Sequence, residues 1–253
     1  MLLFVRRMLR PLVPLRIRKA RAASAVLKQR KRFAHLSSQE IFDTVYKARY
    51  WGRENDESGL SSGSGSRDPD IVEPYVEAVN LFLRRFLPNP LHVVDIGCGD
   101  FFVGRRLVPN AATYSACDVS RHVIDELQRD GHHGNVKFFH LDAANDELPK
   151  GNVVIIRQVM QHLSNEEISK IIQKLYSFDY LILAEHLPIG PFVPNLDKPT
   201  GPDIRLSQKS GVVITEEPFR FTPAAEAVIC ETKNKSADGG MIRTILYRIK
   251  SEE

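Results

Sequence analysis

The sequence lacks an apolar run long enough to cross a lipid bilayer, and it has only three cysteines among 253 residues. Cys98, Cys117 and Cys230 show neither the paired spacing of a disulfide framework nor the clustered spacing of a zinc site. These absences predict a cytoplasmic protein in a reducing compartment, soluble or resting on a surface, with no bound metal. A hydrophobic content of 43% and a charged content of 26% are ordinary for a globular protein.

Acidic residues are absent from positions 1–39, which hold eleven Lys or Arg and leave the remainder of the chain with a net charge of −7. Because the remainder is acidic, we do not expect it to bind nucleic acid. We interpret residues 1–37 as a basic tail. Such a tail could bind RNA, act as a mitochondrial transit peptide or simply remain solvated, but we favour association with an anionic membrane surface through residues 1–36.

A helical cap is predicted over residues 38–88, at the start of the main domain. Its first helix covers Ser38–Tyr50, with Ser38 as the capping residue, and its second covers Asp70–Phe86. Between them lies a Ser- and Gly-rich segment at 61–66, shortly after Trp51, the only tryptophan. This segment is either a flexible linker or a loop whose backbone amides close over a bound ligand.

Strands and helices alternate through the rest of this single domain, which we place at 38–253. The expected strands are His92–Ile96, Thr113–Asp118, Val136–His140, Val153–Arg157 and Tyr180–Ala184. Helices are expected over 120–129 and, after a Ser-x-x-Glu capping box, over 164–176. Segments 227–231 and 242–249 then form an antiparallel hairpin. This order predicts an α/β fold with a mostly parallel sheet, an antiparallel C-terminal hairpin and helices on both faces.

The run His-Val-Val-Asp-Ile-Gly-Cys-Gly-Asp at 92–100 joins an apolar strand to an acid and two glycines, and the next strand ends at Asp118, nineteen residues after Gly99. This arrangement is typical of a nucleoside pocket at the carboxyl ends of two parallel strands. The third glycine of a dinucleotide site is missing, because Phe102 stands at its position and Gly104 comes two residues too late. The Gly-Lys-Ser/Thr element of a phosphate-binding loop is also absent.

The pattern resembles the class I S-adenosylmethionine-dependent methyltransferases over roughly residues 70–249. The resemblance implies a Rossmann-like fold with S-adenosylmethionine as cofactor. Asp95, Gly97 and Gly99 would line the amino-acid end of the cofactor, whose carboxylate would meet the amino-terminus of a following helix. Asp118 would accept hydrogen bonds from the ribose, and Asp142 would meet the adenine. The implied cofactor contacts are Trp51, Asp95, Gly97, Gly99, Asp118, Val119, Asp142, Ala143 and Gln158.

A narrower resemblance lies at 157–164, Arg-Gln-Val-Met-Gln-His-Leu-Ser, which looks like the segment after the fourth strand in small bacterial methyltransferases of largely unassigned substrate. Some of these occur with glycan or natural-product enzymes. The Asn/Asp-Pro-Pro-aromatic signature of amino methyltransferases is missing from this position. The resemblance therefore implies the reaction class more strongly than it implies the acceptor.

Methyl transfer to an oxygen or nitrogen atom is helped by a base with a pKa near neutrality. His162 follows the fourth strand and His186 follows the fifth, so either histidine is a candidate base. We favour His186, with Glu185 orienting it or acting as a second candidate. The alternative for His162 is a structural histidine that packs beneath the cofactor.

The segment 188–223 contains seven prolines and is interpreted as an acceptor lid, although a plain surface loop is the alternative. In the lid interpretation Arg205 pairs with an acid or phosphate of the substrate and Asp203 is a second contact, unless the two residues pair with each other. The combined hypothesis is a methyltransferase acting on an oxygen of a small-molecule or glycan-type acceptor near a membrane. The alternative is a cofactor-binding scaffold or organelle assembly factor without turnover.

Overall fold

The computed structural model describes residues 32–52, 60, 62–63, 65–129, 131, 134–233 and 239–251. The chain divides into two units, Met1–Leu36 and Ser37–Glu253. The membrane, transit-peptide and RNA interpretations of the tail therefore lie almost entirely outside the described residues. None of the helices in the described part of the chain has the length and apolar character that crossing a membrane requires.

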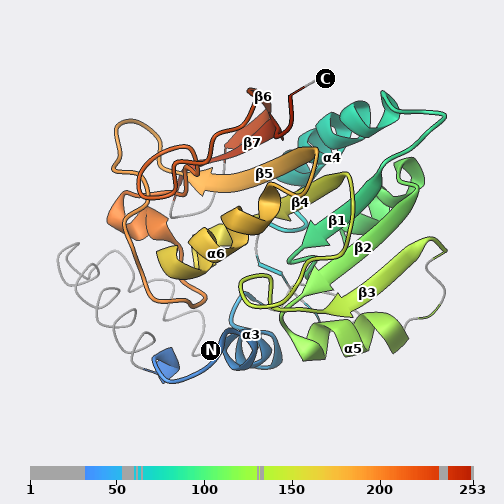
Figure 1. The fold of residues 1–253 in the computed structure, drawn as a ribbon. Helices are drawn as coiled ribbons and strands as arrows, with labels where there is room; N and C mark the ends of the chain where they lie inside the picture. Colours follow the sequence, from blue (N-terminus) through green and yellow to red (C-terminus); the bar gives the residue numbers. More distant parts are fainter. Residues whose placement is uncertain are drawn as a thin grey trace. The chain divides into compact units, whose positions relative to one another are not determined.

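A seven-stranded sheet with the order β3-β2-β1-β4-β5-β7-β6 forms the centre of the Ser37–Glu253 unit (Figure 1). Neighbouring strands are parallel from β3 to β5, whereas β7 is antiparallel to both β5 and β6. The predicted sheet with its antiparallel hairpin is thus confirmed. The strands are β1 His92–Ile96, β2 Thr113–Asp118, β3 Val136–His140, β4 Val153–Arg157, β5 Tyr180–Leu187, β6 Ala225–Lys233 and β7 Met241–Arg248.

The central strands β1 and β4 are apolar on both faces because helices or loops cover both faces of the sheet. Val94 and Ile156 belong to the core on one face, and Val93 and Ile155 belong to the core on the other. The ends of these two strands are fixed in register, with Ile96 opposite Ile156. This register brings the turns that follow β1 and β4 together at the carboxyl edge of the sheet.

Two helices cover one face, namely α4 (Pro69–Arg84) and α5 (Arg121–Arg129), and they contribute Val79 and Val123 to its core. The other face carries α6 (Asn165–Leu175), which lies across β4 and β5 in Figure 1. Part of that second face is covered by irregular chain rather than by a helix. Val212, Ile214 and Phe221 from the segment 188–223 are buried in the same core as α6.

The remaining helix, α3, spans Ser38–Lys47, and its capping residue is Ser37 rather than the predicted Ser38. The Ser37 hydroxyl accepts a hydrogen bond from the Glu40 amide in a reciprocal capping box. This arrangement releases the Ser38 hydroxyl, which donates to Glu167 on α6 instead. The capping box predicted for α6 is present, with Ser164 and Glu167 as its members.

The connection between β1 and β2 contains no α-helix, although the resemblance implied one whose amino-terminus would hold a carboxylate. All of its residues are described, and they form only two short 3-10 turns, Gly104–Arg106 and Val108–Asn110. The expectation is therefore wrong at this point. Glycines with low helix propensity and Pro109, which lacks an amide donor, explain why a regular helix does not propagate here.

Candidate functional site

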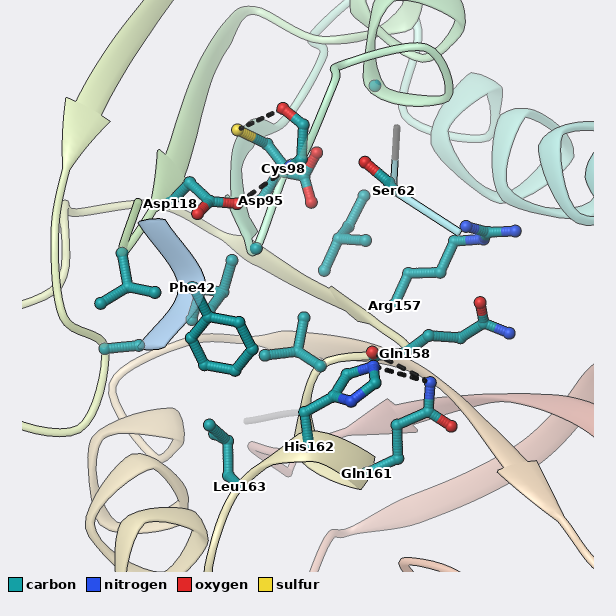
Figure 2. A pocket seen from close by; sticks show the side chains of 18 of the residues that line it. Phe42, Ser62, Asp95, Cys98, Asp118, Arg157, Gln158, Gln161, His162 and Leu163 are labelled. Atoms are coloured by element: carbon teal, nitrogen blue, oxygen red, sulfur yellow. Dashed lines mark hydrogen bonds between the residues drawn. The ribbon is translucent and has the colours of Figure 1, made fainter. Parts of the chain in front are cut away.

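A cleft opens at the carboxyl ends of β1, β2 and β4 and is bordered by α3 and α4 (Figure 2). Its lining includes all nine residues expected to contact a cofactor, together with His162. The lining residues are Ser38, Phe42, Tyr46, Trp51, Ser62, Ser66, Tyr75, Asp95, Ile96, Gly97, Cys98, Gly99, Asp100, Val103, Gly104, Leu107, Asp118, Val119, Leu141, Asp142, Ala143, Ala144, Ile155, Arg157, Gln158, Val159, Gln161, His162, Leu163, Glu167 and Ile171.

We divide the lining into two named parts. The strand-end half consists of residues at or just after the carboxyl ends of β1, β2 and β3. The aromatic half consists of rings from α3, the segment after it and the turn after β4. Members of the strand-end half are Asp95, Gly97, Gly99, Asp118, Val119, Asp142 and Ala143. Members of the aromatic half are Phe42, Tyr46, Trp51 and His162.

The two glycines after β1 adopt positive φ angles of 73° at Gly97 and 54° at Gly99. A Cβ atom at Gly97 would overlap the Val159 side chain, and one at Gly99 would overlap the Ser62 hydroxyl. Glycine is therefore needed because chain segments from both sides approach the turn closely. The turn exposes its backbone to the cleft as a result.

Asp118 ends β2 and is buried, with one carboxylate oxygen accepting from the Gly99 amide at 3.0 Å and the other from the Ser120 amide at 2.8 Å. Burial raises the pKa of Asp118 to about 6, although these two amide hydrogen bonds lower it in part. A carboxylate oxygen can accept more than one hydrogen bond. Asp118 can therefore hold two hydroxyl groups of a ligand while it orders the glycine turn.

Asp95 lies inside β1 and accepts a hydrogen bond from the Tyr114 hydroxyl at 2.8 Å. Burial again raises its pKa to about 6, and the Tyr114 hydrogen bond opposes the shift. Asp142 follows β3, where its carboxylate accepts from the Ala144 amide at 2.9 Å and from the Asn145 side-chain amide at 2.8 Å. Part of the Asp142 carboxylate is thus engaged in a local turn beside the cleft.

Four aromatic side chains pack together in the aromatic half. The Trp51 ring centroid lies 5.3 Å from that of Tyr46 and 5.2 Å from that of His162, and Phe42 lies 6.3 Å from His162. Phe42 and Tyr46 were not expected at the site. Their spacing of four residues, which is visible in the sequence, places them on one face of α3.

His162 is buried, and burial together with the nearby positive charge of Lys198 lowers its pKa to about 3. The imidazole is therefore neutral at physiological pH. Its Nε2 lies 3.4 Å from the side-chain nitrogen of Gln161, as Figure 2 shows. Gln161 also donates to the Gln158 carbonyl at 3.2 Å, whereas its Oε1 is buried without a hydrogen-bond partner among the described residues.

Glu185 does not line the cleft, so its expected catalytic role is withdrawn. Its carboxylate accepts hydrogen bonds from the backbone amides of Met160 at 2.9 Å and Gln161 at 3.1 Å. Burial raises its pKa to about 8, against these amide bonds and the attraction of Arg205. The side chain turns beneath the segment after β4 and fixes its backbone, which presents Gln161 and His162 to the cleft.

Arg205 is likewise not a substrate contact, because it is only 1% exposed and is absent from the cleft lining. Its guanidinium donates to four carbonyl oxygens and one side-chain oxygen, at 2.8–3.2 Å. The acceptors are the carbonyls of Met160, Gln161, Leu163 and Leu196 and the Asn165 side chain. Arg205 therefore stabilises the turn after β4 from the side opposite the ligand.

Asp203 also lies outside the cleft lining and pairs with the buried Lys198 ammonium at 3.7 Å. It does not pair with Arg205 among the interactions of the described residues. No described residue of 188–223 lines the cleft, although the Trp51 indole donates to the Pro202 carbonyl at 3.5 Å, and the acceptor-lid interpretation stays a prediction. The segment packs on the sheet as a supporting layer, and its Asn195 side chain bonds the backbone of Val213 and Glu217.

His186, the favoured base, is directed away from the cleft. Although it lies near the carboxyl end of β5, its Nε2 is 3.0 Å from the carbonyl oxygen of Gly239 before β7, and its ring packs against Gly240. Because β5 continues through Leu187, His186 lies within the strand opposite Ile242 of β7, and its ring reaches the chain that leads into β7. It cannot act on a ligand bound in the cleft.

Arg157 and Tyr75 are further cleft residues that sequence reasoning did not assign. The Arg157 guanidinium lies over the Tyr75 ring, 5.2 Å from its centroid. The sequence did contain a sign that Arg157 lies at a functional site, because it is the only charged residue of the otherwise apolar strand β4, Val-Val-Ile-Ile-Arg. Among the described residues, no group of three or more His, Cys, Asp or Glu is arranged to hold a metal ion.

A family model matches the part of the chain that forms most of the cleft. Residues 94–178 match the family model of a methyltransferase domain, so the match begins within β1 and ends after α6. Asp95, both glycines of the β1 turn, Asp118, Asp142 and His162 all lie inside the matched range. No curated protein matches the chain.

Two solved structures share the fold. One is the N-methyltransferase NodS from Bradyrhizobium japonicum WM9 in complex with S-adenosyl-L-homocysteine, with a TM-score of 0.57 and 12% identity over 82% of this chain and 100% of that one. The other is the magnesium protoporphyrin IX methyltransferase ChlM from Synechocystis PCC 6803 with bound S-adenosylmethionine. Its TM-score is 0.52, with 20% identity over 85% of this chain and 99% of that one.

Proposed function

We propose that this chain, which carries a class I S-adenosylmethionine-dependent methyltransferase domain, transfers the methyl group to an oxygen atom of a small-molecule or glycan-type acceptor. The observation that carries the proposal is the pairing, in one cleft, of the strand-end half with the aromatic half, beside which the buried Gln161 Oε1 atom lacks a hydrogen-bond partner among the described residues. The names of the two similar proteins, an N-methyltransferase and a magnesium protoporphyrin IX methyltransferase, indicate different acceptors. The shared fold therefore does not identify the acceptor of this chain.

The strand-end half fits S-adenosylmethionine, which supplies a methyl group activated on a sulfonium. Asp118 would accept from the two ribose hydroxyls, because its carboxylate reaches the cleft and retains accepting capacity. Val119 and Ala143 provide apolar surface for the adenine, with Asp142 at its edge. Asp95 and the glycine turn would hold the amino-acid end.

The aromatic half fits an acceptor that carries a hydroxyl group. The Gln161 Oε1 atom is buried without a partner among the described residues, and a buried unsatisfied acceptor is costly unless a ligand supplies a donor. A hydroxyl of the acceptor, separate from the oxygen that receives the methyl group, would supply that donor. The rings of Phe42, Trp51 and His162 would exclude water and align the acceptor with the methyl group.

His162 remains a candidate catalytic residue, as an orienting hydrogen-bond partner of the acceptor rather than a strong base. A group whose pKa is lowered to about 3 accepts a proton poorly at neutral pH. The acceptor oxygen that fits best is therefore one that is ionised before transfer, such as a carboxylate or an acidic hydroxyl. Transfer to such an oxygen needs no proton removal by the protein.

The proposal is tested by transfer of radiolabelled methyl groups from S-adenosylmethionine into fractionated cell extracts. We expect label in a small-molecule or glycan fraction, as an ester released by mild alkali or as an alkali-stable ether identified by mass spectrometry. Asp118→Ala provides the control for enzyme-dependent label. Label on nitrogen would contradict the oxygen assignment. Cofactor binding without any transfer would favour the alternative of a scaffold or assembly factor without turnover.

We further propose that residues 1–36 bind an anionic membrane surface. The support is compositional, since the tail holds eleven basic residues and no acidic ones. The full chain should sediment with phosphatidylserine vesicles, and a chain lacking residues 1–36 should not. If both sediment equally, the tail is not the membrane contact. A mature amino-terminus after residue 30 in mitochondria would instead support the transit-peptide alternative.

A further inference from the structure

We propose that Arg157 binds the carboxylate at the amino-acid end of S-adenosylmethionine, beside the glycine turn after β1. The inference rests on the proposed function, because it takes that cofactor as the ligand. It assigns to a side chain the role that the resemblance gave to a helix amino-terminus. That helix is absent, since residues 104–110 form only short 3-10 turns.

Arg157 has buried hydrogen-bond donors that the described residues do not satisfy. Its Nε and Nη2 atoms are buried without a hydrogen-bond partner. The flat face of the guanidinium rests on the Tyr75 ring, which leaves the N–H edges available. Two neighbouring donors of a guanidinium match the two oxygens of a carboxylate, and such bidentate pairs are among the strongest hydrogen bonds in proteins.

The charge of Arg157 also lacks a direct ion pair among the described residues. The two acids that influence it already have partners: Asp100 pairs with Arg67 at 3.0 Å, and Asp95 accepts from Tyr114. Burial lowers the pKa of Arg157, which shows that its environment disfavours the unbalanced cation. A ligand carboxylate would supply both the missing charge and the missing acceptors.

The position of Arg157 fits the amino-acid end of the cofactor. Ile156 pairs with Ile96, so the residues that follow them, Arg157 and Gly97, lie next to each other at the ends of β4 and β1. Figure 2 shows Arg157 and Asp118 on different sides of the pocket. A cofactor whose ribose is held by Asp118 would therefore extend past the glycine turn toward Arg157, with Asp95 near its ammonium group.

The test compares two ligands that differ at the amino-acid end. S-adenosylhomocysteine carries the carboxylate, whereas 5′-methylthioadenosine lacks the whole amino-acid part. Calorimetric titration of Arg157→Gln should show an affinity for S-adenosylhomocysteine lowered about 10- to 100-fold, the range for hydrogen bonds to charged groups. Its affinity for 5′-methylthioadenosine should change less than about twofold, because that ligand makes no such bond. Arg157→Lys should recover part of the lost affinity, because it keeps the charge but not the planar fork.

Arg106→Gln is the matched control, since it removes one positive charge from the surface pair with Glu73 and should leave both affinities unchanged. The ligand-free Arg157→Gln protein should unfold at the same or a higher temperature than the wild type, because an unpaired buried cation has been removed. A similar loss for both ligands, or a loss for neither, would overturn the assignment. If the wild type bound neither ligand, the proposed function itself would fail.

Discussion

The two halves of the cleft are built in opposite ways. The strand-end half is assembled from short turns that each follow a strand directly, and its key contacts join the ends of neighbouring strands, as the Asp118–Gly99 hydrogen bond does. The aromatic half brings α3 and Trp51 together with the turn after β4, which lies more than one hundred residues further along the chain. Sheet register alone fixes the first half, whereas tertiary packing must fix the second.

The difference is visible in what supports each half. The Asp118 carboxylate accepts hydrogen bonds from the amides of Gly99 and Ser120, which lie beside it in the structure. Asp118 therefore both orders the surrounding backbone and presents acceptor oxygens to a ligand. The Gln161 backbone is held by Glu185 and Arg205, and the His162 carbonyl accepts from the Lys198 ammonium and the Gly201 amide, although none of these four residues lines the cleft. Side chains of the types that often act in catalysis can therefore support a site without lining it. The following experiments separate the two halves, beginning with the largest expected effect.

Arg205→Met should cause the largest effect, because it leaves several buried carbonyl oxygens and Glu185 without their cationic partner. We expect the free energy of unfolding to fall by roughly 3–5 kcal/mol, measured by urea titration. Arg220→Met is the control on the same segment, since Arg220 forms an exposed pair with Glu217, and it should cause no measurable change. A wild-type stability for Arg205→Met would show that the turn after β4 does not depend on this support.

Asp118→Ala should lower the affinity for S-adenosylhomocysteine about 100-fold, because two hydrogen bonds to a charged acceptor are lost. Calorimetric titration provides the measurement. Asp142→Ala should have a smaller effect, since part of that carboxylate is engaged in its own turn. Equal losses of affinity in the two variants, or unchanged binding in Asp118→Ala, would contradict the prediction that Asp118 contributes more to cofactor binding than Asp142 does.

Affinity for S-adenosylhomocysteine should depend on pH through Asp118, whose pKa burial raises to about 6 from an ordinary 3.8. Ribose hydroxyls donate best to the ionised carboxylate, so affinity should fall about tenfold between pH 7 and pH 5. Unliganded stability has the opposite sign. The native protein keeps a proton that the unfolded chain has lost, so this group's contribution to stability decreases as the pH rises from about 4 to about 6. In Asp118→Asn the pH dependence of affinity should flatten, whereas unliganded stability should keep the part contributed by Asp95 and Glu185, whose pKa values burial also raises. If the pH dependence of affinity persisted, it would be reassigned to Asp95.

His162 variants should affect the cofactor least. His162→Phe and His162→Gln should each change the affinity for S-adenosylhomocysteine less than about threefold, because the residue belongs to the aromatic half and lies at the margin of the cofactor contacts. With the acceptor found by the extract screen, retained turnover in the Gln variant and loss in the Phe variant would indicate an orienting hydrogen bond. The reverse order would indicate that only the ring matters.

The sheet and the strand-end half were predictable because they depend on local patterns. Apolar runs gave the strands, and the spacing of Gly97, Gly99 and Asp118 followed from parallel strands whose ends share one edge. The missing helix after β1 was not foreseen because a family pattern was applied to a segment whose glycines and Pro109 oppose helix formation. Local propensity was the better guide there.

The roles of His186, Glu185 and Arg205 could not be predicted, because each depends on side-chain direction. Placing a residue at the end of a strand does not say which face it takes, and the continuation of β5 through Leu187 turns His186 toward the hairpin. Arg205 has the chemistry of an anion receptor, yet packing brings it to backbone carbonyls. Arg157 shows the converse, since its exposure to the cleft follows from alternation along β4.

Helix α3 is tethered near its start and near its middle. Near its start, Ser38 donates to Glu167 on α6, and further along, Asp43 accepts from the Ser120 hydroxyl at 2.6 Å and the His122 amide at 3.2 Å at the beginning of α5. Movement of α3 away from the cleft therefore requires the hydrogen bonds of Ser38 and of Asp43 to break together. We expect the demethylated cofactor to dissociate slowly if it leaves past α3. Movement of this short helix, rather than methyl transfer, would then limit the rate of the catalytic cycle.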